Sequence, residues 1–229
     1  MNHRHPSKFQ EPSKPFRLVK YFTMTSLIVI FAGAIILSGL NIHWARQMQL
    51  KKSEDYALLL IENLNHQIFL QFIIPTVLKY GNIHLRENDQ FELMDKVVRS
   101  TLHSFNVDRV NIYDLDNTIS YSLDRKVVGK QNAGGTYYQH ALKGLRRTHL
   151  EQRGNFLQLL FGIPDESRII TYAPLRAEKP LSRVPGPVLG VVELVQDISS
   201  EYQAIFRVQI RVILTSTAVM LLLFLILLL

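Results

Sequence analysis

Two stretches without a charged residue constrain this chain more than any other feature of its sequence. Tyr21–Ile42 and Val212–Leu229 contain no Lys, Arg, Asp or Glu, although the whole chain has 26 basic and 19 acidic residues. At about 1.5 Å of rise per helical residue, each stretch would be roughly 27 to 33 Å long, which matches the hydrocarbon core of a bilayer. We therefore predict membrane-spanning helices over residues 21–42 and 212–229, with a folded domain over residues 43–211.

The positive charges predict the orientation of the chain. Residues 1–20 carry five Lys and Arg side chains against Glu11 alone, and basic residues beside a span favour the cytoplasm. We expect residues 1–20 to be a cytoplasmic tail and residues 43–211 to be extracytoplasmic. The first apolar stretch is too long for a signal peptide and lacks a small-residue cleavage site, so we expect an uncleaved anchor.

The second apolar stretch ends on Leu227, Leu228 and Leu229, with no Lys or Arg after it. Spanning helices usually have such anchors at both ends. Either the chain ends in the membrane or, as we expect, a cytoplasmic output module of a longer polypeptide follows.

Composition and motifs exclude several classes of function. The chain has no cysteine, which excludes disulfides, thiol redox chemistry and thiolate metal sites. A pI near 9.6 reflects mainly the tail beside the membrane, so we expect a lipid bilayer and no nucleic acid as a partner. The His spacings offer no zinc site, and no nucleophile elbow or phosphate-binding loop is present. We therefore expect no catalytic residues, no metal and no cofactor in these residues.

Hydrophobic periodicity predicts an α+β domain between the spans. A helix over 43–80 is interrupted by Pro75 and is stopped by Gly81 and Asn82. A second helix is capped by Asn88 or Asp89 and continues to Phe105. A short helix places Tyr138, Ala141, Leu142 and Leu145 on one face, and a closing helix begins at Ser200 after a cap at Asp197 or Ser199. Five strands are expected to form one antiparallel sheet with helices on one face: 109–114, 118–122, 148–161 with a break at Arg153–Asn155, 168–175 and 188–195. The first two strands are predicted to form a hairpin around an Asp-Asn turn at Asp116 and Asn117.

An apolar stripe on the first helix has two interpretations. Ile61, Leu64, Ile68 and Phe72 repeat at helical spacing. The stripe either packs against the sheet or contributes to a parallel dimer seam, and both uses can coexist on different faces of the helix.

Three segments resemble Cache domains, also called PDC or PAS-like sensor domains: Val110-Asn-Ile-Tyr-Asp-Leu-Asp-Asn-Thr-Ile-Ser-Tyr-Ser, Tyr172-Ala-Pro-Leu and Gly186-Pro-Val-Leu-Gly-Val-Val-Glu-Leu-Val-Gln-Asp-Ile-Ser. The resemblance implies a PAS-like five-stranded sheet and a periplasmic input region anchored in the bacterial inner membrane. It also implies a homodimer whose output is a histidine kinase, with a diguanylate cyclase or a chemoreceptor as alternatives. An exported domain that binds another protein is a further alternative.

The resemblance also implies where a ligand would bind. In that family small molecules lie between the sheet and the segment joining its second and third strands, here Leu123–Arg147. Cationic and hydroxyl side chains there suit a carboxylate or a phosphate. The candidate ligand contacts are Tyr121, Ser122, Arg125, Tyr137, Tyr138, His140, Arg147 and Tyr172.

Each of these residues also has a plainer interpretation. A strand Tyr is commonly a packing residue, Arg146 and Arg147 suit the end of a helix, and His140 suits a helix surface, although it could also sense protons. Glu193 shares a strand face with Val191 and Val195, which predicts a buried carboxylate paired with an arginine.

Overall fold

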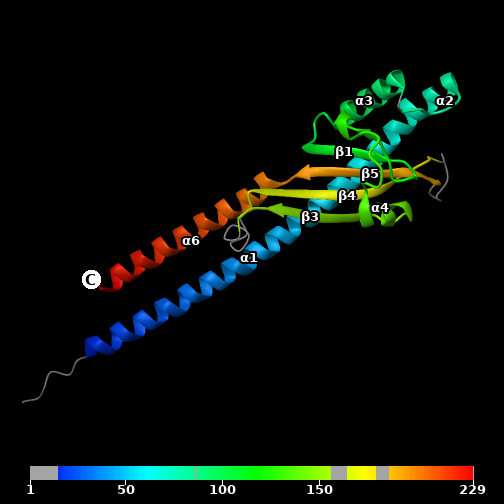
Figure 1. The fold of residues 1–229 in the computed structure, drawn as a ribbon. Coiled ribbons are helices and arrows are strands. Elements are labelled where there is room, and N and C mark those ends of the chain that lie inside the picture. Colours follow the sequence, from blue (N-terminus) through cyan, green and yellow to red (C-terminus); the bar gives the residue numbers. More distant parts are fainter. Residues whose placement is uncertain (1–14, 86, 156–163, 179–185, 229) are drawn as a thin grey trace, which may run out of the picture. The chain divides into compact units, whose positions relative to one another are not determined.

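The structure is a computed structural model that describes residues 15–85, 87–155, 164–178 and 186–228 (Figure 1). The chain divides into two compact units. One comprises Met1–Trp44 with Arg207–Leu229, and the other comprises Ala45–Phe206. The first unit contains both apolar stretches, and the second contains the sheet.

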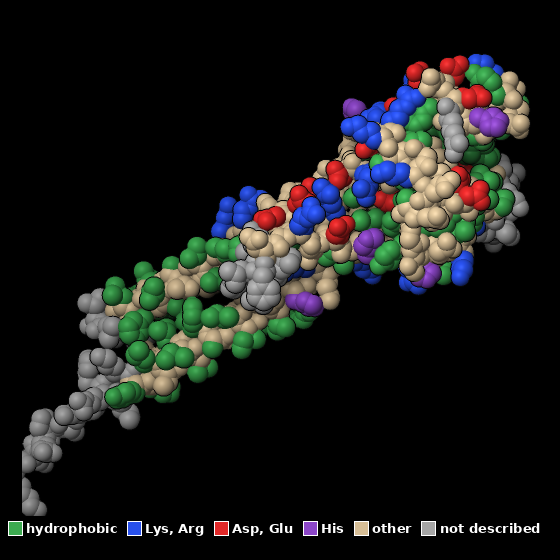
Figure 2. Space-filling model, in the orientation of Figure 1, with side chains coloured by type: hydrophobic (Ala, Val, Ile, Leu, Met, Phe, Trp, Pro, Cys, Tyr) green, Lys and Arg blue, Asp and Glu red, His purple; other side chains and the backbone are tan. Residues whose placement is uncertain are grey.

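The unit with the apolar stretches is built from parts of two long helices, α1 (Pro15–Ile68) and α6 (Ser199–Leu228). Both helices are long and apolar enough to cross a membrane, and only 6% of the most apolar window of each is buried. A core helix of a soluble protein would bury most of such a window, so the exposed side chains favour a lipid environment. Hydrophobic side chains cover both stretches, and charged side chains gather over the other unit (Figure 2).

A polar contact lies within this first unit. The Gln209 side-chain amide donates to the Ser38 carbonyl oxygen at 3.2 Å and also to the Ser38 hydroxyl, and both side chains are buried. Such interhelical hydrogen bonds stabilise pairs of helices in lipid, where no water competes for the polar groups.

The described strands form one five-stranded antiparallel sheet in the order β2-β1-β5-β4-β3, which confirms the predicted fold class. β5 is the central strand, paired with β1 on one side and β4 on the other. Its valine-rich sequence suits this buried position. The strands are β1 (Val107–Tyr113), β2 (Ile119–Ser122), β3 (Arg147–Arg153), β4 (Glu166–Arg176) and β5 (Val188–Asp197).

One face of the sheet packs against α1 and α3 (Asn88–Leu102). The apolar stripe of α1 is almost completely buried in this core, at 0 to 2% exposure for its four members. The packing interpretation of the stripe is therefore confirmed, and its use in a dimer stays a prediction. The stripe meets apolar residues from three strands, among them Val110, Ile112, Ala173, Leu175, Val192 and Leu194.

The predicted interruption of the first helix takes the form of a π-helix, η1 (Phe69–Ile73), followed by α2 (Ile74–Tyr80). Pro75 lacks an N–H and cannot continue the α-helical bonding pattern. The wider π turn just before it satisfies the backbone differently, because the Ile74 N–H donates to the Phe69 carbonyl. Gly81 then ends α2 at φ +78°, as predicted.

The prediction of helices on one face only is wrong. α4 (Gly135–Leu142) packs on the face opposite α3, with Tyr138 and Ala141 buried against Tyr113 and Val191 (Figure 1). The reason is that the central strand is apolar on both faces, so each face needs a cover.

Several boundaries also differ from the predictions, and α3 ends at Leu102 instead of Phe105. α3 already includes Asn88, and the N-cap residue is Glu87, which makes no side-chain capping bond. Leu145 does not extend α4, because Gly144 ends the turn at φ +85° and leaves Leu145 half exposed. The third strand stops at Arg153. Residues 154 and 155 lie outside the strand, at the predicted break, and 156–161 lie outside the described residues.

The β1–β2 hairpin is confirmed, and polar side chains hold its turn. One Asp114 carboxylate oxygen accepts the backbone N–H groups of Asp116 at 3.0 Å and Thr118 at 2.9 Å. Asn117 adopts φ +59°, which Asn tolerates better than most residues, and its side-chain oxygen accepts the Gly134 N–H at 3.0 Å. This last bond attaches the hairpin to the start of α4.

The start of α6 carries a testable pH dependence. α6 begins one residue earlier than predicted, at Ser199, so Ile198 directly precedes it, but the Asp197 carboxylate still satisfies the first turn: it accepts the Ser199 hydroxyl at 2.5 Å and the Ser199 N–H at 2.9 Å. The hydroxyl bond is the largest cause that lowers the Asp197 pKa below 3.8; burial opposes it, and the N–H bond also lowers it. Because the pKa falls on folding, the carboxylate stabilises the fold above its unfolded pKa, and this contribution is lost as pH falls through the folded pKa.

Asp197→Ala should therefore lower the free energy of unfolding by about 0.5–2 kcal/mol at pH 7, as expected for loss of a helix cap. The difference from the wild type should shrink once the pH lies below the folded pKa. Denaturant unfolding at pH 7 and at a pH below the folded pKa of Asp197 measures this difference. Glu201→Ala, in the first turn of α6, is the control. An equal loss at both pH values would contradict the capping role.

Candidate functional site

The face of the sheet that carries α4 contains a polar row that crosses all five strands. Directly paired residues on neighbouring antiparallel strands lie on the same face, and here the pairings connect one residue from each strand. The row consists of Ser122 on β2, Asn111 on β1, Glu193 on β5, Tyr172 on β4 and Arg147 on β3.

Glu193 is the centre of this row, and its side chain is only 3% exposed. One carboxylate oxygen accepts the Arg109 guanidinium at 3.0 Å and the Asn111 amide at 3.2 Å. The other accepts the Tyr172 hydroxyl at 3.0 Å and the Tyr113 hydroxyl. Four donors from the two strands that flank β5 therefore stabilise one buried charge, which confirms the prediction of a buried Glu193 paired with an arginine.

The two phenols of this cluster remain protonated donors at neutral pH. Burial is the largest cause that raises the pKa of Tyr113 and Tyr172, and the nearby Glu193 carboxylate raises both further. An ionised phenol would repel the carboxylate, so the cluster holds only with both hydroxyls protonated.

A polar cavity of about 280 Å³ adjoins the row through Arg109. Three arginines contribute to its wall, and Arg168 also forms ion pairs with Asp108 at 3.4 Å and Glu166 at 3.7 Å. The wall comprises Arg109, Glu151, Arg153, Glu166, Arg168, Ile170 and Val195. Arg109 is already paired with Glu193, and Arg168 with Asp108 and Glu166, whereas Arg153 forms no ion pair among the described residues, so Arg153 is the guanidinium that can bind an anion here.

Three aromatic rings lie beside the row on the same face. Tyr137 of α4 stacks on His149 of β3 with ring centroids 4.3 Å apart, and on Tyr172 of β4 at 5.8 Å. The interplanar angles are 12° and 15°, so the rings are nearly parallel. Tyr172 thus connects the ring stack to Glu193.

The structure brings only some of the eight predicted contacts together. Ser122, Arg147 and Tyr172 lie on the polar row, and Tyr137 stacks beside it. Tyr138 instead holds the hairpin, because its hydroxyl donates to the Asp114 carbonyl at 2.8 Å and accepts the Asn117 N–H at 3.1 Å.

Two of the predicted contacts belong to the other face of the sheet. Tyr121 is buried against Phe91 of α3 and donates to Asp95 at 2.9 Å. Arg125 lies over the Phe91 ring and donates to Asn88 at 2.6 Å. These two side chains face the α1 and α3 core and do not share a site with Tyr172.

His140 is partly buried on α4, and its Nδ1 has no hydrogen-bond partner among the described residues. The same is true of Nδ1 in His149, which the sequence analysis did not single out. Arg109, Arg153 and Arg168 were also not predicted from the sequence. Strand alternation could have found Arg109, because it lies two residues before Asn111 on β1 and so shares its face.

No family model matches this sequence, and no curated protein matches it. Among solved structures the chain is similar to the crystal structure of the V. cholerae histidine kinase DctB sensor domain, at 15% sequence identity and a TM-score of 0.42. The likeness covers 70% of this chain and 56% of that chain, so this chain spans little more than half of that structure. The site is therefore interpreted from its own residues.

Proposed function

We propose that this chain is the sensory and membrane part of a transmembrane receptor. In this proposal the sheet-containing unit lies outside the cytoplasm and binds a small carboxylate or phosphate in the cavity of Arg109, Arg153 and Arg168. The single observation that carries the proposal is the position of β5. This central strand holds the buried Glu193 cluster beside the cavity and leads through Ile198 directly into α6, a candidate membrane span.

The chemistry of the cavity supports an anionic ligand. Guanidinium groups bind carboxylates and phosphates with paired, directional hydrogen bonds. Among the described residues Arg153 forms no ion pair, which leaves its guanidinium available to a ligand. Arg109 donates to Glu193, so a ligand that draws Arg109 away would alter the contacts of β5.

The coupling to the membrane requires only a modest difference in binding energy. A ligand that binds one arrangement of the Glu193 cluster more tightly than another shifts the population between them, and coupling of about 1–3 kcal/mol is typical of such systems. The change would reach α6 through the short connection at Ile198, whose N–H donates to the Ser167 carbonyl at 2.9 Å.

The proposal has two further parts, which concern the cytoplasmic output and the oligomeric state. We propose a homodimer that drives a histidine kinase, with a cyclase or chemoreceptor output as the alternatives. Apolar side chains that α1 leaves exposed, such as Met48 at 73% and Leu59 at 64%, support a protein contact along this helix.

Ligand binding can be measured on the full chain in lipid nanodiscs by thermal unfolding against inorganic phosphate and a panel of organic acids and amino acids. An anion at about 100 times its Kd should add roughly 2.7 kcal/mol to the free energy of unfolding. Arg153→Ala should weaken that binding at least tenfold. Arg147→Ala, also on β3 but outside the cavity, should change it much less. Absence of stabilisation by every anion would overturn the proposed ligand class.

The proposed orientation is tested separately. A protease site introduced at Asn132, in an exposed turn, should be cut from outside the cytoplasmic membrane of intact spheroplasts. Cleavage only after lysis would place the sheet-containing unit in the cytoplasm and overturn the receptor proposal.

A further inference from the structure

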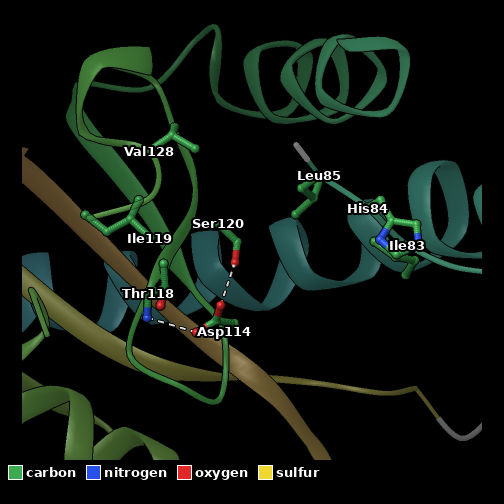
Figure 3. A pocket seen from close by; sticks show the side chains of 8 residues that line it. All are labelled: Ile83, His84, Leu85, Asp114, Thr118, Ile119, Ser120 and Val128. Atoms are coloured by element: carbon green, nitrogen blue, oxygen red, sulfur yellow. Dashed lines mark hydrogen bonds between the residues drawn. The ribbon is translucent and has the colours of Figure 1, made fainter. Parts of the chain in front are cut away.

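Two adjoining cavities lie on the opposite face of the sheet from the arginine cavity, at the end where β1 turns into β2. Their volumes are about 400 and 310 Å³, and both are lined by Ile83, Leu85, Asp114 and Ser120. In Figure 3 the segment Ile83 to Leu85 faces the hairpin residues across the smaller cavity, and Asp114 and Ser120 lie at its centre. We call the pair the hairpin cavity.

The larger part of the hairpin cavity is mainly apolar. Its wall comes from α1, η1, α3 and the strands, and includes Ile68, Phe72, Ile73, Met94, Ile112 and Leu175. Ile83 and Leu189 of this wall are 40% and 41% exposed, so the cavity opens to solvent, and moving an apolar group from water into it is favourable. A space of this size and lining is therefore suited to the apolar body of a small molecule.

The π-helix shapes this wall. Phe72 and Ile73 are consecutive residues of η1, and both line the cavity. Such π segments recur at functional sites, because the wider turn changes the direction of side chains without ending the helix.

The polar end of the hairpin cavity carries one negative charge. One Asp114 oxygen accepts two backbone N–H groups of the turn, whereas the other accepts only the Ser120 hydroxyl, at 3.4 Å. Among the described residues no Lys, Arg or His forms an ion pair with Asp114. The second oxygen therefore retains lone pairs that can accept a charged donor.

We propose that the hairpin cavity is a second binding site, for a small organic cation with an apolar body, of which an alkylammonium ion is the simplest. The ammonium group would donate to the free side of the Asp114 carboxylate and to the Ser120 hydroxyl. The alkyl chain would lie against Phe72, Met94 and Leu175. This site takes the opposite charge from the arginine cavity and is lined by different residues, so it does not depend on the proposed anion sensing.

Binding can be tested with hexylammonium, with hexanol and hexanoate as probes of the same length and different head groups. Isothermal titration of the full chain in nanodiscs, corrected with empty nanodiscs, should show saturable binding of hexylammonium. Hexanol should bind at least tenfold more weakly, and hexanoate should not bind. Equal affinity for the three probes, or no saturable binding of hexylammonium, would overturn the proposal.

Two variants locate the site. Asp114→Asn keeps a side-chain oxygen for the turn but removes the charge, and should weaken hexylammonium binding at least tenfold. Ile83→Trp, at a 40% exposed position that lines both parts of the cavity, should block it by filling space without removing core atoms. Leu78→Trp is the matched control, because Leu78 is 83% exposed and lines neither part.

The Ile83→Trp result keeps the test decisive if Asp114→Asn unfolds the hairpin. Binding that survives in Ile83→Trp would overturn the proposal, as would binding that is lost equally in Leu78→Trp. Arg153→Ala should leave hexylammonium affinity unchanged, so failure of the anion site and failure of the hairpin cavity give different results.

Discussion

Glu193→Ala should lower the free energy of unfolding of the sheet-containing unit by about 3–5 kcal/mol, the range seen when one partner of a buried ion pair is removed. The substitution leaves the Arg109 guanidinium, the Asn111 amide and two tyrosine hydroxyls without their common acceptor. Each buried donor that loses its partner carries a desolvation cost of its own, which is why the loss exceeds that of a single hydrogen bond.

Chemical denaturation of the full chain in nanodiscs, followed by far-ultraviolet circular dichroism, measures this loss. Glu151→Ala is the matched control, because Glu151 is an exposed carboxylate that lines the arginine cavity, and it should cost about 0.5 kcal/mol or less. Glu193→Gln should fall between the two, since the amide oxygen can still accept but its NH₂ group faces hydroxyl donors. A Glu193→Ala loss as small as that of Glu151→Ala would show that the cluster contributes little to stability.

The second large effect on stability is expected in the hydrophobic core between the sheet and the helices α1 and α3. Leu64→Ala should destabilise the unit by about 2–5 kcal/mol, because Leu64 is completely buried in α1 and its truncation leaves a cavity. Leu59→Ala removes the same atoms from the same helix where the side chain is 64% exposed, and should cost less than about 1 kcal/mol. The same denaturation experiment compares them.

This pair of variants also distinguishes the two interpretations of α1, packing against the sheet and contact in a dimer. If exposed positions of α1 form a dimer contact, Leu59→Ala should reduce the dimer fraction in analytical ultracentrifugation, and Leu64→Ala should reduce mainly the stability. Equal stability losses for both variants would contradict the assignment of the buried stripe.

Much of the fold followed from local patterns. The 3.6-residue repeat of Leu64 and its neighbours, the Asp-Asn turn and the alternation around Glu193 each depend on residues close in sequence, and each prediction was confirmed. The second helical layer was missed because short apolar runs do not show whether a strand is covered on one face or two. Only the assembled sheet reveals that β5 needs α4 as well as α1.

The predicted site mixed residues that the backbone separates. Tyr121 and Ser122 are neighbours on β2, so their side chains must point to opposite faces, and the set that included both could not form one site. Periodicity alone would have shown this conflict. The ion pair of Arg109 with Glu193 lies beyond such reasoning, because it joins positions 84 residues apart and depends on the register between two strands.

The alternation of β5 restricts how far the strand can travel along its axis. Successive side chains of a strand point to opposite faces about 3.4 Å apart, so a slide by one residue would turn Glu193 into the apolar layer beneath α1. The buried carboxylate therefore acts as a stop against register slippage. A piston stroke of β5 delivered to α6 must be shorter than about 3.4 Å, and any larger output movement has to arise from tilting or rotation of the helix.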